Sequence, residues 1–418
     1  MELKKYNANH TQVLKINQIV RTISETHKFD KDKLIAINTS DVENGVMGNG
    51  TLTFVDELKG QFKKTIVKDD ILFSEIRPAN RRFAKVTTKN TKDYVVSTKL
   101  MVLRKYNEDV DLEYFYYCLT NQPFLDILQR RAENRIGSFP QITFDLLSEY
   151  AFPIPPISEQ KRISSVISTL DKKIALNRQI NQNLEAMAKQ LYDYWFVQFD
   201  FPNEEGKPYK SSGGEMVWNE KLKRMIPKEW TNANIYQLAC ISKETVNPLA
   251  RPNELFKHYS LPEYDKTGTY AEEYGIDIQS AKFTVTNNCI LVSKLNPWTS
   301  RVICGNRESN QICSTEFVVW NPISMKTKGF LFMLAKSAKF IEYCTQGATG
   351  TSHSHRRINP ELMMKFDFSY NSEIAIKFSR LIENIIGKLH DNIAQLKVLT
   401  KQRDELLPLL MNGQITIE

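Results

Sequence analysis

The chain has 418 residues, 41% of them hydrophobic and 25% charged, so it is long enough for two domains that each bury a core. Its net charge of +8 favours a polyanionic partner, and its apolar runs are far shorter than the roughly 20 residues that a membrane helix needs. No apolar segment follows the charged N-terminus, so we expect a cytoplasmic protein without a secretory signal.

The second half of the sequence repeats the signals of the first half in the same order. DDILFSEIRP at 69–78 and NCILVSKLNP at 288–297 are strand-like runs that end on a proline. Ser-Thr then stands between apolar residues at 95–103 and again at 312–320. Two further pairs of matching runs follow, at 114–121 with 330–337 and at 142–152 with 358–368. Such a repeat predicts two similar domains of mixed α and β structure.

Each repeat leads into a long amphipathic helix. A proline-rich run at 153–156 delays the first helix, and we predict Ser158 and Ser372 as N-caps, each followed by a glutamate that favours the helix dipole. Apolar residues at steps of four and three over more than four heptads predict a coiled coil. The seam positions are Ile163, Ile167, Leu170, Ile174, Asn177, Leu184 and Leu191 in the first helix and Ile382, Ile385, Leu389, Asn392, Leu396, Leu399 and Leu406 in the second.

The two helices are expected to run antiparallel. The first carries the chain about 50 Å from the first domain, so the second must run back to bury its seam. We expect Asn177 and Asn392 to hydrogen-bond across the seam and fix its register, unless both lie at its edge in water. The aromatic run at 191–199 either packs on the second domain, which we prefer, or is a docking surface.

The predicted fold is therefore α+β, with two similar domains separated by a long antiparallel two-helix coiled coil. The predicted boundaries are 1–156 for the first domain, 157–197 for the first helix, 198–228 for a linker, 229–371 for the second domain and 372–413 for the second helix.

Motifs for catalysis are missing from the sequence. Four Asn-Pro pairs lack the second proline and aromatic residue of an adenine methyltransferase loop, and there is no Gly-rich phosphate loop ending in Lys-Ser or Lys-Thr. The nuclease-like order DELK at 56–59 lacks an upstream Pro-Asp. His353 and His355 have no cysteine or acidic neighbour in sequence, and the six cysteines have no Cys-x-x-Cys spacing. We therefore expect a non-catalytic chain without a metal.

Basic and polar loops recur at matched places in the two halves. Arginine forks and short hydroxyl donors on loops are typical of phosphate contacts and base-edge readout, although any one such loop is also compatible with a solvated surface. The candidate DNA-binding residues are Arg77, Arg81, Arg82, Arg135, Ser138 and Gln141 in the first half and Lys294, Trp298, Arg301, Thr349, Thr351, Ser352, His353, His355, Arg356 and Arg357 in the second.

The chain resembles the specificity subunit of type I restriction-modification systems. The resemblance is carried by the helical run at 152–196, the linker at 199–230, the runs at 258–265 and 280–297, and the C-terminal run at 395–415. It implies that each domain is a target-recognition domain that reads one half of a bipartite, asymmetric DNA site. It also implies that the helices set the unread spacer and dock two methyltransferase (M) subunits.

The resemblance further implies partners that carry the chemistry. The M subunits bind S-adenosylmethionine and methylate adenine, and restriction (R) subunits that use ATP and magnesium join for cleavage of double-stranded DNA. A helix of about 50 Å exceeds one DNA turn of roughly 34 to 36 Å, so both domains can face one side of the duplex. The first half departs from the pattern, since RIGSFPQI at 135–142 lacks the small residues of GATGTS at 347–352. The alternative function is an assembly scaffold that has lost DNA readout.

Overall fold

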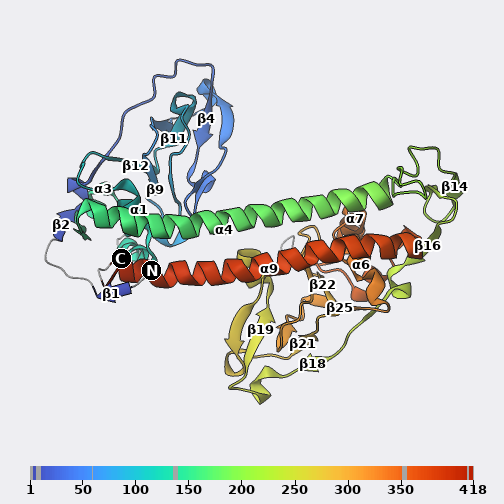
Figure 1. Cartoon of the computed structure of the whole chain (residues 1–418). Coiled ribbons are helices and arrows are strands. Elements are labelled where there is room, and N and C mark those ends of the chain that lie inside the picture. Colours follow the sequence, from blue (N-terminus) through green and yellow to red (C-terminus); the bar gives the residue numbers. More distant parts are fainter. Residues whose placement is uncertain are drawn as a thin grey trace. The chain divides into compact units, whose positions relative to one another are not determined.

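The computed structural model of the chain forms two compact units (Figure 1). Unit 1 comprises Met1–Ile174 and Val398–Glu418, and unit 2 comprises Ala175–Lys397. The residues that the structure describes are 3–5, 11–58, 60–134, 140–350, 355–411 and 414–417. None of the helices within these ranges is both long and apolar enough to cross a bilayer.

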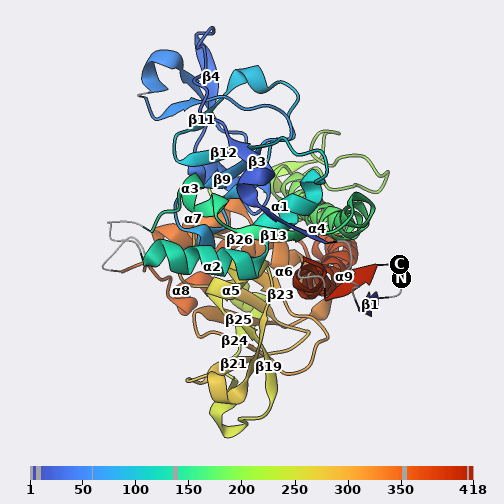
Figure 2. The ribbon, with the colours of Figure 1, turned by 90° about the vertical axis from the view of Figure 1, so that its left-hand side faces the viewer.

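Unit 1 contains two four-stranded sheets. The inner sheet has the antiparallel order β10-β9-β12-β3, and the outer sheet has the order β7-β4-β11-β8 with β4 and β11 parallel. Figure 2 shows the inner sheet between the outer sheet and α1. The bounds are β3 (Val20–Thr22), β4 (Lys33–Ile37), β7 (Thr51–Phe54), β8 (Phe62–Lys64), β9 (Ile71–Ser74), β10 (Phe83–Lys85), β11 (Tyr94–Ser97) and β12 (Leu100–Lys105).

The helices of unit 1 pack on one side of the inner sheet. Strand β2 pairs with β13, which leads into the long helix α4, and β1 pairs with β27 near the chain ends. The bounds are β1 (Leu3–Lys5), β2 (Gln12–Lys15), α1 (Leu112–Thr120), α2 (Gln122–Glu133), α3 (Phe144–Ser148), β13 (Ala151–Ile154) and β27 (Ile415–Ile417).

Unit 2 repeats this plan. Its inner sheet has the order β17-β25-β22-β23, and its outer sheet has the order β18-β21-β24-β19-β20 with β19 and β24 parallel. The bounds are β17 (Ala239–Ile241), β18 (Thr245–Val246), β19 (Leu255–Tyr259), β20 (Ala271–Tyr274), β21 (Lys282–Val285), β22 (Ile290–Ser293), β23 (Val302–Cys304), β24 (Gln311–Cys313) and β25 (Phe317–Pro322).

The helices of unit 2 also follow the order seen in unit 1, and strand β16 pairs with β26 as β2 pairs with β13. The bounds are β16 (Thr231–Asn234), α5 (Leu261–Thr267), α6 (Lys328–Ala335), α7 (Ala338–Gln346), α8 (Pro360–Met364) and β26 (Asp367–Tyr370). The matching strand orders, each with one parallel pair, confirm the prediction of two similar α+β domains.

Two long helices follow the repeats, α4 (Ile157–Tyr192), which continues as a π-helical turn (Asp193–Val197), and α9 (Ser372–Met411). In unit 2, Asn177 Nδ2 donates to Gln395 Oε1 (3.2 Å) and Asn392 Nδ2 donates to Asn181 Oδ1 (3.1 Å), so the two helices run antiparallel. In unit 1, Arg403 Nη1 donates to Asp171 Oδ1 (3.2 Å), which continues the same pairing order.

The expected hydrogen bond between Asn177 and Asn392 is therefore wrong. In the observed register Asn392 lies opposite Asn181, one helical turn along α4, and Asn177 lies opposite Gln395. Among the remaining seam positions, Ile163, Ile167, Ile174, Ile382 and Leu389 are buried, and Leu170, Leu184, Leu191, Ile385, Leu396, Leu399 and Leu406 are half-buried.

The predicted N-caps are also wrong. Helix α4 begins at Ile157, one residue before Ser158, and its first turn is bonded through Glu159 N to Pro156 O (2.8 Å). Helix α9 begins at Ser372 itself, because Asn371 Oδ1 accepts from Ile374 N (3.1 Å). Asparagine is at least as good a cap as serine, and here it stands one residue nearer the preceding strand.

The aromatic end of the first helix packs on the second domain, as preferred from the sequence. Tyr192, Trp195 and Phe196 are buried, and their rings contact Phe378, with Phe196 also 4.7 Å from the ring centre of Phe330. These aromatic rings are therefore part of the core of unit 2.

The segment that follows, predicted as a linker, is folded into the same unit. Phe201 stacks on Trp230, and Asp200 accepts from Ser211 N and Ser211 Oγ (2.7 Å each). A hairpin of β14 (Met216–Asn219) and β15 (Arg224–Pro227) completes this segment.

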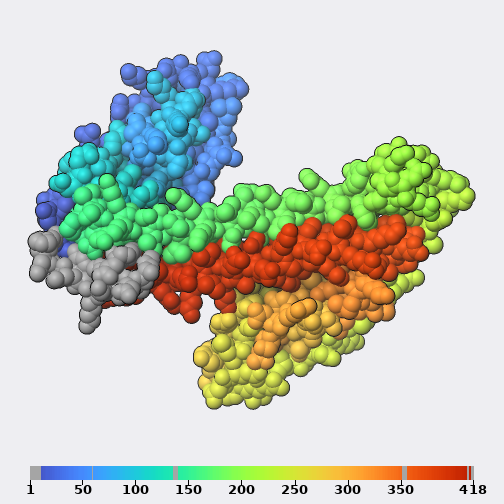
Figure 3. Space-filling view, in the orientation of Figure 1, coloured from blue at the N-terminus to red at the C-terminus, as the bar shows by residue number. Residues whose placement is uncertain are grey.

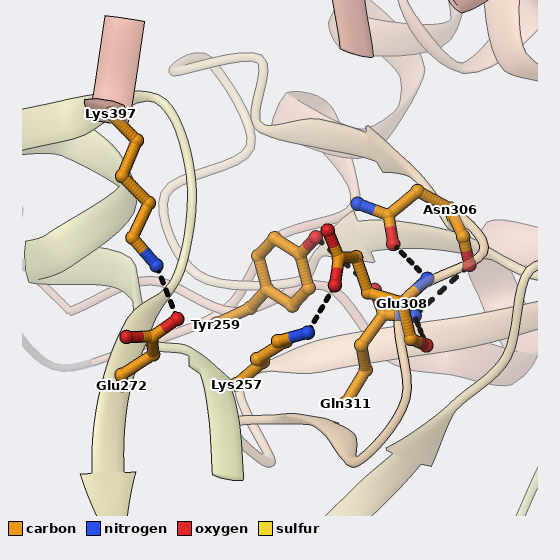
Figure 4. Close-up of polar contacts among 7 residues, drawn as sticks. All are labelled: Lys257, Tyr259, Glu272, Asn306, Glu308, Gln311 and Lys397. Atoms are coloured by element: carbon orange, nitrogen blue, oxygen red, sulfur yellow. Dashed lines mark hydrogen bonds and ion pairs between the residues drawn. The ribbon is translucent and has the colours of Figure 1, made fainter. Parts of the chain in front are cut away.

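Polar contacts attach the outer sheet of unit 2 to α9. Lys397 Nζ on α9 lies 2.5 Å from Glu272 Oε1 on β20, as Figure 4 shows. In the same close-up, Gln311 Nε2 donates to the main-chain oxygens of Asn306 (3.0 Å) and Glu308 (2.6 Å). These bonds fix the loop before β24 and hold the edge of the sheet near the helix.

Candidate nucleic-acid interface

In unit 1 the turn after β9 is held against the segment that precedes α3. Arg77 N donates to Pro140 O (3.1 Å), and Ile76 forms an antiparallel bridge with Gln141. Arg77 has a φ of 46°, in the left-handed region that residues with a side chain seldom adopt. The two loops that the sequence singled out in the first half therefore lie side by side.

Unit 2 contains the same frame. Asn296 N donates to Arg356 O (2.8 Å), and Leu295 forms an antiparallel bridge with Arg357. Asn296 has a φ of 50° and precedes a proline, as Arg77 does. A second bridge joins Arg357 to Thr349, with Arg357 N donating to Thr349 O (2.8 Å).

The shared frame gives three predicted residues of unit 1 a counterpart in unit 2. Asn296 stands where Arg77 stands, and Arg357 stands where Gln141 stands. Arg301 matches Arg82, because the main-chain oxygen of each accepts from the serine that ends β22 or β9 (3.0 and 2.9 Å). The backbone is thus repeated while the side chains differ.

The candidate arginines Arg77, Arg81 and Arg82 of unit 1 are paired with no carboxylate among the described residues. Arg77 is exposed and Arg82 half-buried, and neither makes an ion pair within the described parts of the chain. Arg81 donates to two neutral acceptors, from Nε to Asn44 Oδ1 (2.7 Å) and from Nη1 to Gln122 Oε1 (2.5 Å). Burial, and then the nearby guanidinium of Arg403, lower the pKa of Arg81 from its ordinary value.

Two candidate arginines of unit 2, Arg301 and Arg357, are instead bound to acidic side chains. Arg301 donates from Nε and Nη2 to the two oxygens of Asp265 (2.6 and 2.8 Å) and from Nη1 to Leu295 O (3.4 Å). Only 13% of its side chain is exposed, so few of its donors are left for a ligand.

Arg357 is paired differently. Its Nε and Nη2 donate to Glu316 (2.9 and 3.0 Å), but 45% of its side chain is exposed and Nη1 has no partner among the described residues. The neighbouring Arg356 donates from Nη2 to Ala348 O (2.6 Å), which ties it to its own loop. Of the candidate arginines of unit 2, Arg357 is therefore the most exposed.

The other predicted residues surround this frame. Trp298 is 43% exposed on the turn after β22, and Lys294 and Gln141 are half-buried. Thr349 and His355 are exposed at the described ends of the second loop. The predicted residues that lie outside the described ranges are Arg135, Ser138, Thr351, Ser352 and His353.

Sequence reasoning missed the acidic partners Asp265 and Glu316. For Glu316 a signal was present, because the repeated Ser-Thr is followed by Lys99 in the first half and by Glu316 in the second. The frame confirms this match, since the main-chain oxygens of Lys99 and Glu316 accept from Glu75 N and Lys294 N (3.0 and 2.9 Å). Asp265 lies in α5, whose place after the parallel strand is taken in unit 1 by the three-residue 3-10 turn Thr39–Asp41, so the repeat does not reveal it.

The sequence is similar to that of known DNA-specificity proteins. Residues 10–186 match the family described as the type I restriction modification DNA specificity domain. The chain is 29% identical over 455 residues to the HindI specificity subunit of Haemophilus influenzae, covering 96% of this chain and 98% of that protein. It is 23% identical to the MjaIX specificity subunit of Methanocaldococcus jannaschii, covering 73% of this chain and 69% of that protein.

A solved structure has the same fold. The type I restriction-modification S subunit of M. genitalium aligns with 98% of each chain at a TM-score of 0.59 and 15% identity. The fold and the sequence match are both those of duplicated DNA-specificity proteins. The chain is similar over nearly its whole length to type I restriction-modification specificity subunits, and residues 10–186 match their DNA specificity domain.

Proposed function

We propose that each unit of this chain reads one half of a bipartite, asymmetric DNA site. The observation that carries the proposal is the repeated two-loop frame, which places Arg77, Arg82 and Gln141 in one unit where Asn296, Arg301 and Arg357 stand in the other. A repeated backbone supports the same docking on DNA, whereas different side chains select different bases.

The two long helices set the distance between the half-sites in this proposal. Helix α4 has 36 residues, about 54 Å at roughly 1.5 Å per residue, which exceeds one DNA turn of roughly 34 to 36 Å. Its antiparallel pairing with α9 makes a rod that is stiffer than a single helix. The helices are also the proposed docking site of two methyltransferase subunits.

One face of α4 supports such docking. Within unit 2 it carries Leu176 (59% exposed), Ile180 and Met187 (57% exposed), and the green helix lies at the surface in the view of Figure 3. Their spacing of four and seven residues is a helical stripe, which is typical of a surface that receives another helix.

In this proposal the chain itself catalyses nothing. The M subunits supply S-adenosylmethionine-dependent adenine methylation, and R subunits with ATP and magnesium supply cleavage. Purified chain incubated with DNA and these cofactors is expected to give neither methylated nor cleaved product.

The direct test is a binding selection on randomised duplex DNA with the chain in complex with its methyltransferase partner. The expected result is a motif of two unlike parts with a fixed gap. A stable complex that enriches no motif would overturn the proposal and favour an assembly scaffold that has lost DNA readout.

A further inference from the structure

We infer that Arg357 and Gln141 are the matched base-reading residues of the two units, with Arg357 reading guanine and Gln141 reading adenine in the major groove. The inference rests on the proposed function and deepens it. It assigns the reading role to two side chains among the candidates and states the base that each would select.

The first observation is position. Arg357 and Gln141 each form the bridge with the residue that precedes the left-handed turn, Leu295 in unit 2 and Ile76 in unit 1. The backbone of Arg357 is also fixed on its other side by the bridge to Thr349. Because the backbone is held on both sides, the Cα and Cβ atoms of the side chain have a fixed position. Discrimination between bases requires such a fixed position.

The second observation is the edge that Arg357 leaves free. A guanidinium has one edge formed by Nε and Nη2 and another formed by Nη1 and Nη2. Glu316 occupies the first edge at 2.9 and 3.0 Å. On the second edge Nη1 has no partner among the described residues, and 45% of the side chain is exposed. Two donors on one rigid edge match the O6 and N7 acceptors of guanine.

The third observation is the contrast with Arg301. That guanidinium also gives its Nε edge to a carboxylate, but Nη1 donates to Leu295 O and only 13% of the side chain is exposed. Arg301 therefore holds the turn, while Arg357 keeps its outer edge for a ligand.

The fourth observation is that the supporting residue changes together with the reading residue. Unit 1 has Lys99 where unit 2 has Glu316, and Gln141 where unit 2 has Arg357. Gln141 is half-buried and its amide bonds to no other described side chain or main-chain group. A glutamine amide offers one donor and one acceptor, which match adenine N6 and N7.

Glu316 is a positioning residue in this account. It does not touch the base, but it fixes the plane of the Arg357 guanidinium and neutralises part of its charge. A neutralised arginine attracts phosphates less, so it contributes less to binding that ignores sequence.

The experiment is the binding selection on randomised duplex DNA, repeated with variants of the intact chain in its complex with the methyltransferase partner. Arg357→Gln together with Glu316→Lys gives unit 2 the residues of unit 1. The expected result is that one position of one half-site changes from guanine to adenine, with a preference of about 10- to 100-fold, while the other half-site stays the same. Gln141→Arg is expected to change one adenine of the other half-site to guanine.

Glu316→Gln alone tests the positioning role. We expect the guanine preference to weaken several-fold at unchanged melting temperature, and Glu316→Asp to recover part of it. Arg251→Gln is the matched control, because Arg251 is an exposed arginine near a carboxylate (Glu254, 3.4 Å) outside the two-loop frame, and it should leave the motif unchanged.

Each contrary outcome has a distinct meaning. If the Arg357 and Gln141 variants lose affinity uniformly but keep the wild-type motif, both residues are phosphate contacts and the inference is overturned. The proposed function would still stand in that case, because the motif would still have two parts. A wild-type complex that enriches no motif would overturn the proposed function itself. Melting curves of each variant separate these outcomes from misfolding, and Gln141→Arg tests the inference even if the unit 2 variants do not fold.

Discussion

The two-loop frame of unit 1 and that of unit 2 share a backbone but not an electrostatic character. In unit 1, Arg77 and Arg82 make no ion pair with a described residue, whereas in unit 2 Arg301 and Arg357 are bound to Asp265 and Glu316. Unpaired arginines attract phosphate at long range. An arginine that is paired with a carboxylate attracts phosphate less, but its side chain is held in a fixed orientation. We infer that the two units contribute unequally to affinity and to selectivity.

The largest effect is expected from the helix seam. Ile167→Asp in unit 1 and Ile382→Asp in unit 2 each bury an unpaired carboxylate at a fully buried position, at a cost of about 4 kcal/mol or more of unfolding free energy. Denaturant unfolding measures the loss, and hydrogen exchange shows which unit opens. Leu176→Asp, at an exposed position of α4, is the control and should cost less than about 1 kcal/mol. Equal losses at all three positions would contradict the assigned seam.

The contrast in charge predicts a difference in salt dependence. Arg77→Gln with Arg82→Gln should lower DNA affinity about tenfold or more and reduce the slope of log affinity against log salt by about one per lost phosphate contact. Arg301→Gln should change the slope little and lower the melting temperature of unit 2, because it leaves Asp265 without its partner. DNA titrations at three salt concentrations measure the affinities and slopes, and melting curves measure the stability of unit 2. Equal slopes for the two variants would contradict the proposed difference in free positive charge between the units.

Unit 2 should also be the more sensitive to acid. Burial lowers the pKa of His258 and of His390 from the ordinary value of 6.5, outweighing the effect of Glu273 beside His258. The unfolded chain therefore binds these protons more readily than the folded unit. Stability is complete above about pH 6.5 and falls as the pH drops below it, by at most about 1.4 kcal/mol per pH unit for each histidine. Melting curves from pH 7.5 to 5.5 test this, and His258→Gln with His390→Gln should flatten the dependence.

The smallest effect is expected from the asparagine pair of the coiled coil. Asn392→Leu leaves Asn181 without its 3.1 Å partner at a half-buried position, at a cost of about 1 kcal/mol. Asn181→Leu with Asn392→Leu should recover most of that loss, since two apolar groups can replace a bonded polar pair. A double-mutant cycle by chemical denaturation measures the coupling, and a coupling near zero would mean that the bond does not fix the register.

Much of the fold could be predicted from the sequence because the same strand-like runs and heptads occur in both halves of the chain. The repeated runs and heptads predicted two α+β domains and antiparallel helices, which the strand orders and the Asn392 to Asn181 bond bear out. A heptad pattern does not encode how two antiparallel helices are offset, so the partner of Asn177 was misplaced by one turn. The caps failed because Asn371 competes with Ser372 at adjacent positions, and both are good caps.

The candidate interface was less readable. Composition identified arginine-rich loops but not which arginines are already bonded, since Asp265 and Arg301 lie 36 residues apart in sequence and Glu316 and Arg357 lie 41 apart. Pairing across such distances depends on the fold. Only the internal repeat, which aligns Lys99 with Glu316, gave a local hint.

The most direct test of the central claim, that two matched sites read two unlike half-sites, is methylome sequencing of a host that expresses this chain with its methyltransferase partner. The account predicts methylated adenines within a two-part asymmetric motif whose gap is fixed. Methylation in a single continuous motif, or in none while the complex is stable, would contradict it.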